Sequence, residues 1–295
     1  MASTRQILDR RRAVRDIGKV THTMETVSAV RYQQYYKKWT GGEQFYDTLA
    51  QLAYLIVTAE KTIEHPLMLD NKSDCNAILA IGSDRGLCGA HNANICRLID
   101  VHVDMARRFG KKVKIYAKGA KVIGYLKNRG IRLRETYEDF DEVPSPRQVQ
   151  VIADDFMAQY AAGRIGRLAV VYTRFFSPAS QRAQTLMVLP VAELIDDLTT
   201  RATVIWPWEL AFEDFLLSPS AEKIFDSLAK MMVRASLSAC FLEAALSEHL
   251  ERVVAMRNAT DNADEMAGEL TRQYNRARQA NITEELLEIV SGTIT

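Results

Sequence analysis

The residues that could carry out chemistry are few and dispersed in this chain. Its four cysteines are Cys75, Cys88, Cys96 and Cys240, and they form neither a CxxC pair nor a Cys/His pattern with zinc-ligand spacing. None of the five histidines belongs to an HExxH motif or to an i, i+4 pair. Scattered thiols in a chain of 295 residues are typical of a reducing, intracellular compartment. We therefore expect no metal site and no cofactor.

The segment SDRGLCG at residues 83–89 is the one turn where a phosphate or a reactive thiol could be held. Cys88 stands near a predicted helix start, where the helix dipole would lower the pKa of a thiol. No histidine is placed to assist it by a recognisable pattern, so a buried structural cysteine is favoured. The turn has only Gly86 and Gly89 and lacks both GxGxxG and GK[ST], which disfavours nucleotide binding.

One group of carboxylates, Asp261, Asp264 and Glu265, could resemble an acid/base or metal-binding cluster. A solvated helix face explains this group better, because the surrounding stretch is polar nearly all round. The chain thus offers no catalytic constellation. This favours a mechanical or scaffolding part over an enzyme.

The overall charge excludes further classes. A net charge of +1 gives no global field for binding nucleic acid or a membrane surface. No stretch approaches the ~18 uninterrupted apolar residues of a membrane span, and the N-terminus lacks an apolar signal core. We expect no direct membrane insertion and no leader. Residues 5–19 carry a local excess of four positive charges, which either a solvated helix face or an acidic partner would explain.

The elements that must position any site fall into three regions: 1–60, 73–205 and 218–295. In the first, a narrow apolar stripe at helical spacing indicates a long helix with a coiled-coil partner. We assign to the stripe Ile7, Val14, Ile17, Val20, Met24 and Val27. Gly41-Gly42 predicts a soft spot, a bend or a break in this helix, since each Gly costs roughly 1 kcal/mol relative to Ala.

The middle region alternates strand and helix patterns, which predicts a mostly parallel sheet in an α/β layer. The predicted strands are 75–82, 112–119, 131–137, 166–175 and 182–191, and the predicted helices are 90–109, 120–128 and 147–162. The last two strands are close enough to form an antiparallel hairpin. The fold class is therefore a Rossmann-like α/β domain inserted between two terminal helices.

The third region reads as one helix of over 70 residues, starting near Ser218-Pro219 and running to about Gly292. Its natural partner is the first helix, paired antiparallel, because the middle domain brings the chain back. The C-terminal helix is the longer of the two, so its polar end should project beyond the pair. A polar helix of this length needs something to enclose it.

Three segments carry a resemblance to a known family. The stretches KVTHTMETVSAVR (19–31), SDRGLCGAHNANI (83–95) and RVVAMRNATDNADEMAGELTRQYNRARQANITEELLEIVSG (252–292) resemble three signatures of the gamma subunit of F-type ATP synthases, in the family's order. The resemblance implies a central rotor shaft that catalyses nothing itself. It also implies as partners the alpha and beta subunits around the polar helix, with the epsilon subunit and the membrane ring of c subunits at the α/β domain.

The resemblance also implies contact residues. Arg278, Gln279 and Thr283 correspond to positions that meet a loop of beta near the top of the shaft, with a solvated face as the alternative. Met24 and Arg252 correspond to positions near the acidic lever segment of beta, although Met24 could equally be an ordinary seam residue. Ile289, Val290 and Ile294 would form the tip in a hydrophobic bearing.

Departures from the family pattern include His22-Thr23, the segment 32–57 with its Gly pair, and the absence of the cysteine insert of chloroplast forms. They indicate a divergent bacterial lineage, such as an alternative F-type ATPase peripheral to the cytoplasmic face of the inner membrane. Two other interpretations stay open: a coiled-coil scaffold of another assembly, and a nucleotide-binding α/β enzyme.

Overall fold

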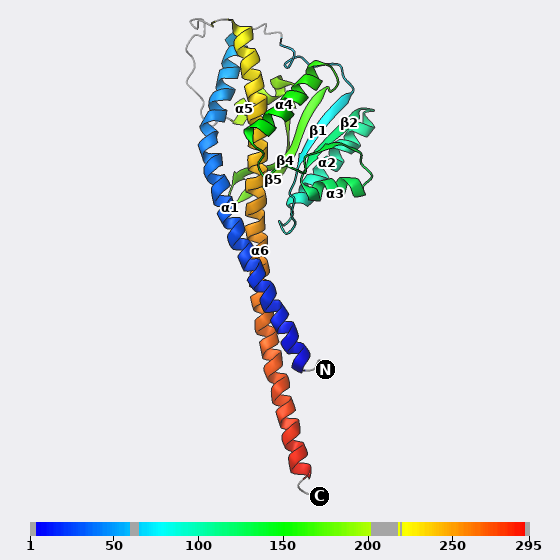
Figure 1. Ribbon diagram of the computed structural model, residues 1–295, viewed down its shortest axis with the longest axis vertical. Coiled ribbons are helices and arrows are strands. Elements are labelled where there is room, and N and C mark those ends of the chain that lie inside the picture. The colour runs from blue at the N-terminus through cyan, green and yellow to red at the C-terminus, as the bar shows by residue number, and fades with distance from the viewer. Residues whose placement is uncertain (1–3, 60–64, 202–217, 219, 293–295) are drawn as a thin grey trace. The chain divides into compact units, whose positions relative to one another are not determined.

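The computed structural model describes residues 4–59, 65–201, 218 and 220–292 (Figure 1). The chain divides into two compact units. One consists of Arg31–Glu251, and the other combines Met1–Val30 with Arg252–Thr295. Two long helices, α1 (Thr4–Ala59) and α6 (Ala221–Gly292), contribute to both units. We call the first the sheet unit and the second the helix-pair unit.

The sheet unit is built on five strands in the order β3-β2-β1-β4-β5. Their bounds are β1 Cys75–Ile81, β2 Lys112–Lys118, β3 Leu133–Thr136, β4 Arg167–Ser177 and β5 Ser180–Leu189. Strands β3, β2, β1 and β4 are parallel to one another. Strand β5 at the edge is antiparallel to β4, with which it forms a hairpin. The predicted mostly parallel sheet with an antiparallel edge is confirmed. The central strand β1 is buried on both faces, as its continuous apolar sequence requires.

Helices cover both faces of this sheet. One face packs against α2 (His91–Arg108) and α3 (Ala120–Asn128) through residues such as Ile95, Ile99 and Val122. The other face packs against α4 (Pro146–Ala161), α5 (Val191–Arg201) and the first turns of α6. This second core includes Phe156, Phe225 and Phe241, each fully buried. The early part of α6 is thereby an integral layer of the α/β fold.

Two details differ from the sequence prediction. Helix α5 was not expected, although Val191, Leu194 and Ile195 have the spacing of a buried helical stripe and are buried. The start of α6 was expected at Ser218-Pro219, but the helix begins at Ala221. The Ser220 hydroxyl accepts a hydrogen bond of 3.4 Å from the Lys223 N–H, which satisfies one of the unpaired amides of the first turn.

Helix α1 continues without interruption through Gly41-Gly42, so the break considered for this position is wrong. Gly41 is exposed and nothing lies within 4 Å of the position of an added Cβ. The helix is anchored on both sides of the pair. Tyr35 and Leu49 are buried in the sheet unit, and their packing outweighs the low helix propensity of two glycines.

In the helix-pair unit α1 and α6 run antiparallel. Thr4 contacts Asn281, Arg11 lies over the ring of Tyr274, and Thr21 contacts Thr260. Residue numbers therefore rise on one helix as they fall on the other. Because Thr4 lies beside Asn281, residues 282–292 of α6 have no part of α1 opposite them. The predicted antiparallel pairing and the projecting end of the longer helix are confirmed.

Candidate functional site

The seam of the helix-pair unit combines small, polar and apolar residues. On α1 the buried positions are Val14, Gly18, Thr21 and Ser28, which follow the heptad spacing of a coiled coil. A Cβ added at Gly18 would lie 3.4 Å from the Ala263 Cβ, so the two helices approach closely there. Beyond Thr21, the Glu25 carboxylate accepts a hydrogen bond of 3.0 Å from Arg257 Nε. Polar contacts thus add to the apolar cluster of Val14, Ala263, Ala267 and Leu270 in holding this pair together.

The apolar residues that the sequence assigned to the seam lie elsewhere. Val14 is buried, as expected, but Ile17, Val20 and Val27 are 56%, 58% and 57% exposed, so their assignment to the seam is wrong. With half-buried Met24 they form a second stripe, at steps of three, four and three residues, on the outside of α1. We call Ile17, Val20, Met24 and Val27 the outer stripe. No described residue of the chain covers it.

The expected upper contact residues are accessible. Arg278, Gln279 and Thr283 are all exposed in the last part of α6. The Thr283 hydroxyl donates a hydrogen bond of 2.9 Å to the Gln279 carbonyl, one turn earlier, which keeps it close to the helix surface. Ile282 is also exposed and lies in the same turn as Thr283. These residues lie within two successive turns of one helix, so a single partner segment could reach all of them.

Arg252 differs from the other expected contact residues because it is only 6% exposed. Its guanidinium is thus enclosed within the chain and is not an open surface group. Met24, by contrast, belongs to the outer stripe. The two residues expected near one lever segment therefore differ in accessibility. Of the expected bearing residues, Ile289 and Val290 lie in the helical backbone of α6, but their side chains and Ile294 are outside the described residues.

The turn at residues 83–89 is filled by its own side chains. Asp84 accepts hydrogen bonds from the Ala120 N–H at the start of α3 (3.1 Å) and from Lys118 Nζ (3.2 Å). Its carboxylate thus caps the N-terminus of α3 and ties the turn to the end of β2. Cys88 is buried and 3.2 Å from the Asn92 amide nitrogen. These contacts favour the structural interpretation of the turn over nucleotide binding.

Histidines and carboxylates in the sheet unit occur as separate pairs. His65 contacts Asp226 at 3.2 Å, His91 lies 3.6 Å from Glu251, and His249 contacts Glu142 at 2.9 Å. Among the residues the structure describes, no group of three or more potential ligands could hold a metal ion. Asp261, Asp264 and Glu265 are exposed on α6, as a solvated helix face requires.

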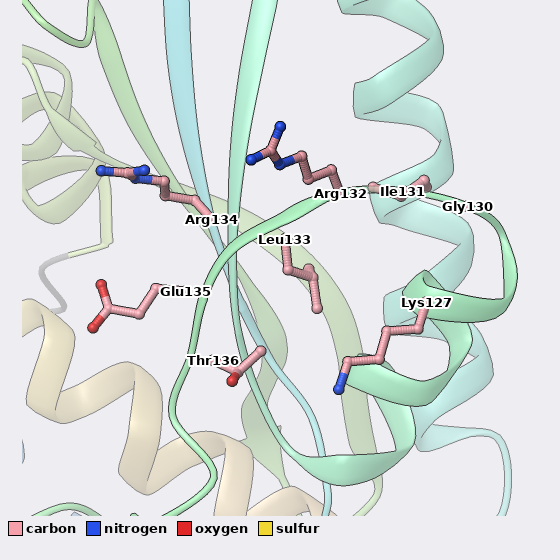
Figure 2. A pocket seen from close by; sticks show the side chains of 8 residues that line it. All are labelled: Lys127, Gly130, Ile131, Arg132, Leu133, Arg134, Glu135 and Thr136. Carbon is pink, nitrogen blue, oxygen red and sulfur yellow. The ribbon is translucent and has the colours of Figure 1, made fainter.

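A pocket of about 440 Å³ lies beside the edge strand β3 and the end of α3 (Figure 2). Lys127, Arg132 and Arg134 are among its lining residues. Figure 2 shows that the charged ends of these side chains point in different directions and do not converge on a common point. The pocket therefore lacks the focused charge of an anion site. Separately, no described helix combines the length and the apolar character needed to cross a membrane.

The described fold defines a class of protein in which helices from both ends of the chain pair antiparallel and an α/β sheet unit is inserted between them. The chain belongs to the ATP synthase family, whose sequence profile matches residues 3–294. It is 33% identical to the ATP synthase gamma chain of Rhodopirellula baltica over 99% of this chain and 98% of that one. The gamma chain of Leptospira biflexa is 31% identical, with the same coverage of both chains.

Solved structures agree with this assignment at the level of the fold. The rotor of the Euglena gracilis mitochondrial ATP synthase aligns with a TM-score of 0.64 at 20% identity, covering 95% of this chain and 98% of that one. A second structure of that enzyme, comprising OSCP, F1 and the c-ring, gives a TM-score of 0.65 at 19% identity, with coverage of 99% and 93%. The expected family and fold class are confirmed.

Proposed function

We propose that this chain is the central rotor shaft of an F-type ATP synthase. It couples ion-driven rotation of a membrane ring to the conformational cycle of catalytic sites on surrounding beta subunits, and it is not catalytic itself. Gamma-chain relatives along nearly the whole length and a rotor-like fold support this function. Its partners are then alpha and beta subunits around the helix pair, an epsilon subunit and a c-ring at the sheet unit.

The observation that carries this proposal is the outer stripe. Three of its four residues are more than half exposed on a helix whose own seam lies elsewhere. Burying such residues gains about 25 cal/mol per Å² of apolar surface, so a surrounding ring can bind the stripe. The four residues form one narrow line and not a broad apolar face. The apolar area that contacts any one subunit of a ring is therefore small. Weak contacts of this kind suit a rotor, because each contact must break as the rotor turns to the next subunit.

Specific contacts follow from the same proposal. Arg278, Gln279 and Thr283 engage a beta loop near the top of the shaft, where a guanidinium and an amide offer several hydrogen-bond donors. Met24 meets the acidic lever segment of beta through the outer stripe. Arg252, being enclosed, acts there by holding the helix pair in position. Ile289, Val290 and Ile294 form the tip in an apolar bearing.

In this proposal, residues 1–60 and 218–295 form the shaft. Residues 73–205 form the foot, the domain that meets the epsilon subunit and the c-ring. The chain is then a peripheral component of a membrane-bound complex, on the cytoplasmic face of a bacterial inner membrane. No nucleic acid, cofactor or metal is part of this function.

The test is co-expression with the alpha and beta subunits encoded in the same genome, followed by assays of ATP hydrolysis and torque. We expect one copy of this chain in each active complex. Arg278→Ala combined with Gln279→Ala should lower the torque, whereas Asn275→Ala, an exposed change one turn earlier, should not. If the chain never enters a complex in which another gamma chain assembles normally, the shaft function is refuted and a scaffold of another assembly takes its place.

A further inference from the structure

One carboxylate in the sheet unit links three segments that are far apart in the sequence. Glu142 lies in the loop between β3 and α4. Its Oε2 atom accepts a hydrogen bond of 2.8 Å from the Tyr35 hydroxyl on α1 and contacts His249 Nε2 on α6 at 2.9 Å. The rings of Tyr35 and His249 lie 5.6 Å apart. We call Tyr35, Glu142 and His249 the clasp.

Two of the three residues of the clasp are buried. Tyr35 and His249 are 7% and 4% exposed, whereas the Glu142 side chain is 36% exposed. An apolar cluster that includes Tyr35 lies here, and its other members come from α1, the β3–α4 loop, β4 and α6, namely Tyr32, Tyr36, Trp39, Val143, Phe175, Leu242, Ala245, Leu246 and Leu250. Within this cluster Trp39 and Phe175 meet edge to face at 5.0 Å. Restricted access of water strengthens the hydrogen bonds of the clasp.

Charge stabilises the clasp as well. The hydrogen bond from His249 is the main cause that lowers the pKa of Glu142 to about 2, with the Tyr35 hydroxyl and Arg31 acting in the same direction against burial. Burial and the bond to Glu142 raise the pKa of Tyr35 above its ordinary value. Glu142 is thus ionised and Tyr35 neutral near pH 7, which makes their contact a charge-assisted hydrogen bond.

The clasp lies where the two long helices leave the sheet unit. The unit ends at Arg31 on α1 and at Glu251 on α6, so Tyr35 and His249 are each within about one turn of that end. Glu142 is also firmly placed. Its loop ends at Ser145, the N-cap of α4, which forms a capping box with Gln148 in the first turn of that helix. A change in Glu142 therefore acts on both helices at their exit.

Among the side chains that the structure describes, those of the two long helices differ in how they pack on the sheet. Helix α6 contributes a continuous series from Phe225 to Ala244 to the main apolar core. The described residues of α1 in that core are Leu49 and Ala53 alone. Near its exit, α1 is fixed by the clasp and the aromatic cluster beside it. Apolar contacts are non-directional, whereas a charge-assisted hydrogen bond resists rotation of a helix about its own axis.

We propose that Glu142 is a positioning residue for torque transfer, which makes α1 and α6 turn together with the sheet unit at the point where they leave it. This inference rests on the proposed shaft function and assigns the coupling of foot and shaft to one side chain. Without the carboxylate, α1 can slip relative to α6 when the helix pair is loaded. Energy released at the catalytic sites is then lost before it reaches the foot.

The test measures ion pumping per ATP hydrolysed in the complete reconstituted complex. Glu142→Ala removes the clasp, Glu142→Gln keeps its shape but not its charge, and Tyr35→Phe removes one of its two hydrogen bonds. The matched control is Asp154→Asn. Asp154 makes a 2.7 Å ion pair with Arg234, which joins α4 to α6 and leaves α1 out.

We expect Glu142→Ala to lose most pumping while ATP hydrolysis is kept, with smaller losses in Glu142→Gln and Tyr35→Phe and no change of the ratio in Asp154→Asn. An unchanged ratio in Glu142→Ala overturns the inference. So does a loss in which pumping, hydrolysis and the amount of this chain per complex fall together in all three clasp variants, because that identifies a purely structural role. A wild-type complex that excludes this chain refutes the shaft function itself, which is a separate result.

Discussion

Thr21 of α1 and Thr260 of α6 lie opposite each other in the helix pair, with their hydroxyl oxygens 2.8 Å apart. Each hydroxyl also lies within hydrogen-bond distance of a carbonyl of its own helix, Gly18 at 3.0 Å and Met256 at 2.9 Å. The two hydroxyls have two protons for these three contacts, so one hydroxyl donates to the other and one carbonyl receives the remaining proton. The seam at this level is therefore closed by a polar contact. A coiled coil of ordinary stability would have apolar side chains at these positions.

The first prediction concerns this contact. Thr21→Val should lower the free energy of unfolding by about 1 kcal/mol, because it leaves the Thr260 hydroxyl without its cross-helix partner. The double change to valine at both positions should recover that loss and can exceed the wild type, since both polar groups are then gone. Urea unfolding of the full chain measures both values. Thr26→Val, an exposed change on the same helix, is the control, and equal effects of the single and double changes would contradict the prediction.

The second prediction concerns Gly41. Gly41→Ala should raise the free energy of unfolding by about 1 kcal/mol, because alanine favours the helix and open space surrounds the position. Gly163→Ala should have the opposite sign. Gly163 has φ of 66°, which a side chain disfavours, although no atom lies within 4 Å of the added Cβ. Thermal unfolding compares the two variants, and a loss of stability in Gly41→Ala would show that the glycine is required for a conformation other than this helix.

The third prediction concerns the ion pair beside the turn at 83–89. Asp84→Ala should cost about 1–3 kcal/mol, because the Lys118 ammonium is only 2% exposed and loses its acidic partner. Adding Lys118→Met should recover much of this cost, since the buried charge is then removed. The denaturant midpoints of the single and double variants measure how much of the lost stability is recovered. If the double variant is as unstable as Asp84→Ala, the helix cap at Ala120 and not the ion pair is the main contribution.

The fourth prediction concerns pH. The pKa of Glu142 is lowered from 4.5 to about 2 in the folded chain, so the ionised clasp stabilises the fold above pH 4.5. This contribution is lost as pH falls from 4.5 through 2. The difference in unfolding free energy between the wild type and Glu142→Gln should therefore be constant near neutral pH and shrink in that acidic window. Urea unfolding across the pH range measures it, with Glu265→Gln setting the baseline for loss of one exposed charge. A difference that grows on acidification would exclude the clasp geometry.

The sheet unit was largely predictable because each strand carries its own pattern. Ala77–Ile81 is a continuous apolar run within β1, and the helix after it begins within one residue of the expected start. Helix α5 was missed even though Val191, Leu194 and Ile195 give a local signal. The start of α6 was misplaced because Ser218 and Ser220 both suit an N-cap, and sequence alone does not choose between them.

The seam of the helix pair was not predictable from hydrophobicity. Two stripes on α1 have the same heptad spacing, one through Val14, Gly18 and Thr21 and the other through Ile17, Val20 and Val27. A pattern search selects the more apolar of the two, and here that stripe faces outward. What distinguishes the seam is the contact of α1 at Gly18 with Ala263, together with the pairing of Thr21 and Thr260. Both contacts involve residues of two helices, so the sequence of one helix alone does not predict them.

The clasp was likewise outside the reach of sequence analysis, because Tyr35, Glu142 and His249 lie in three separate segments without a shared motif. The proposed contact residues Arg278, Gln279 and Thr283, which are exposed, were predicted only through the resemblance to a family. In the chain by itself they look like any solvated helix face. Their proposed role depends on a partner, and no property of a single chain reveals it.

The unpaired end of α6, residues 282–292, has a consequence for how such a complex is put together. Starting a helix is costly, whereas extending one that already exists takes only one residue at a time. The helix pair up to Asn281 supplies that start, so the last turns can unwind and rewind while the paired part keeps its structure. In the proposed complex, this end can therefore take its final helical form after the paired part has folded.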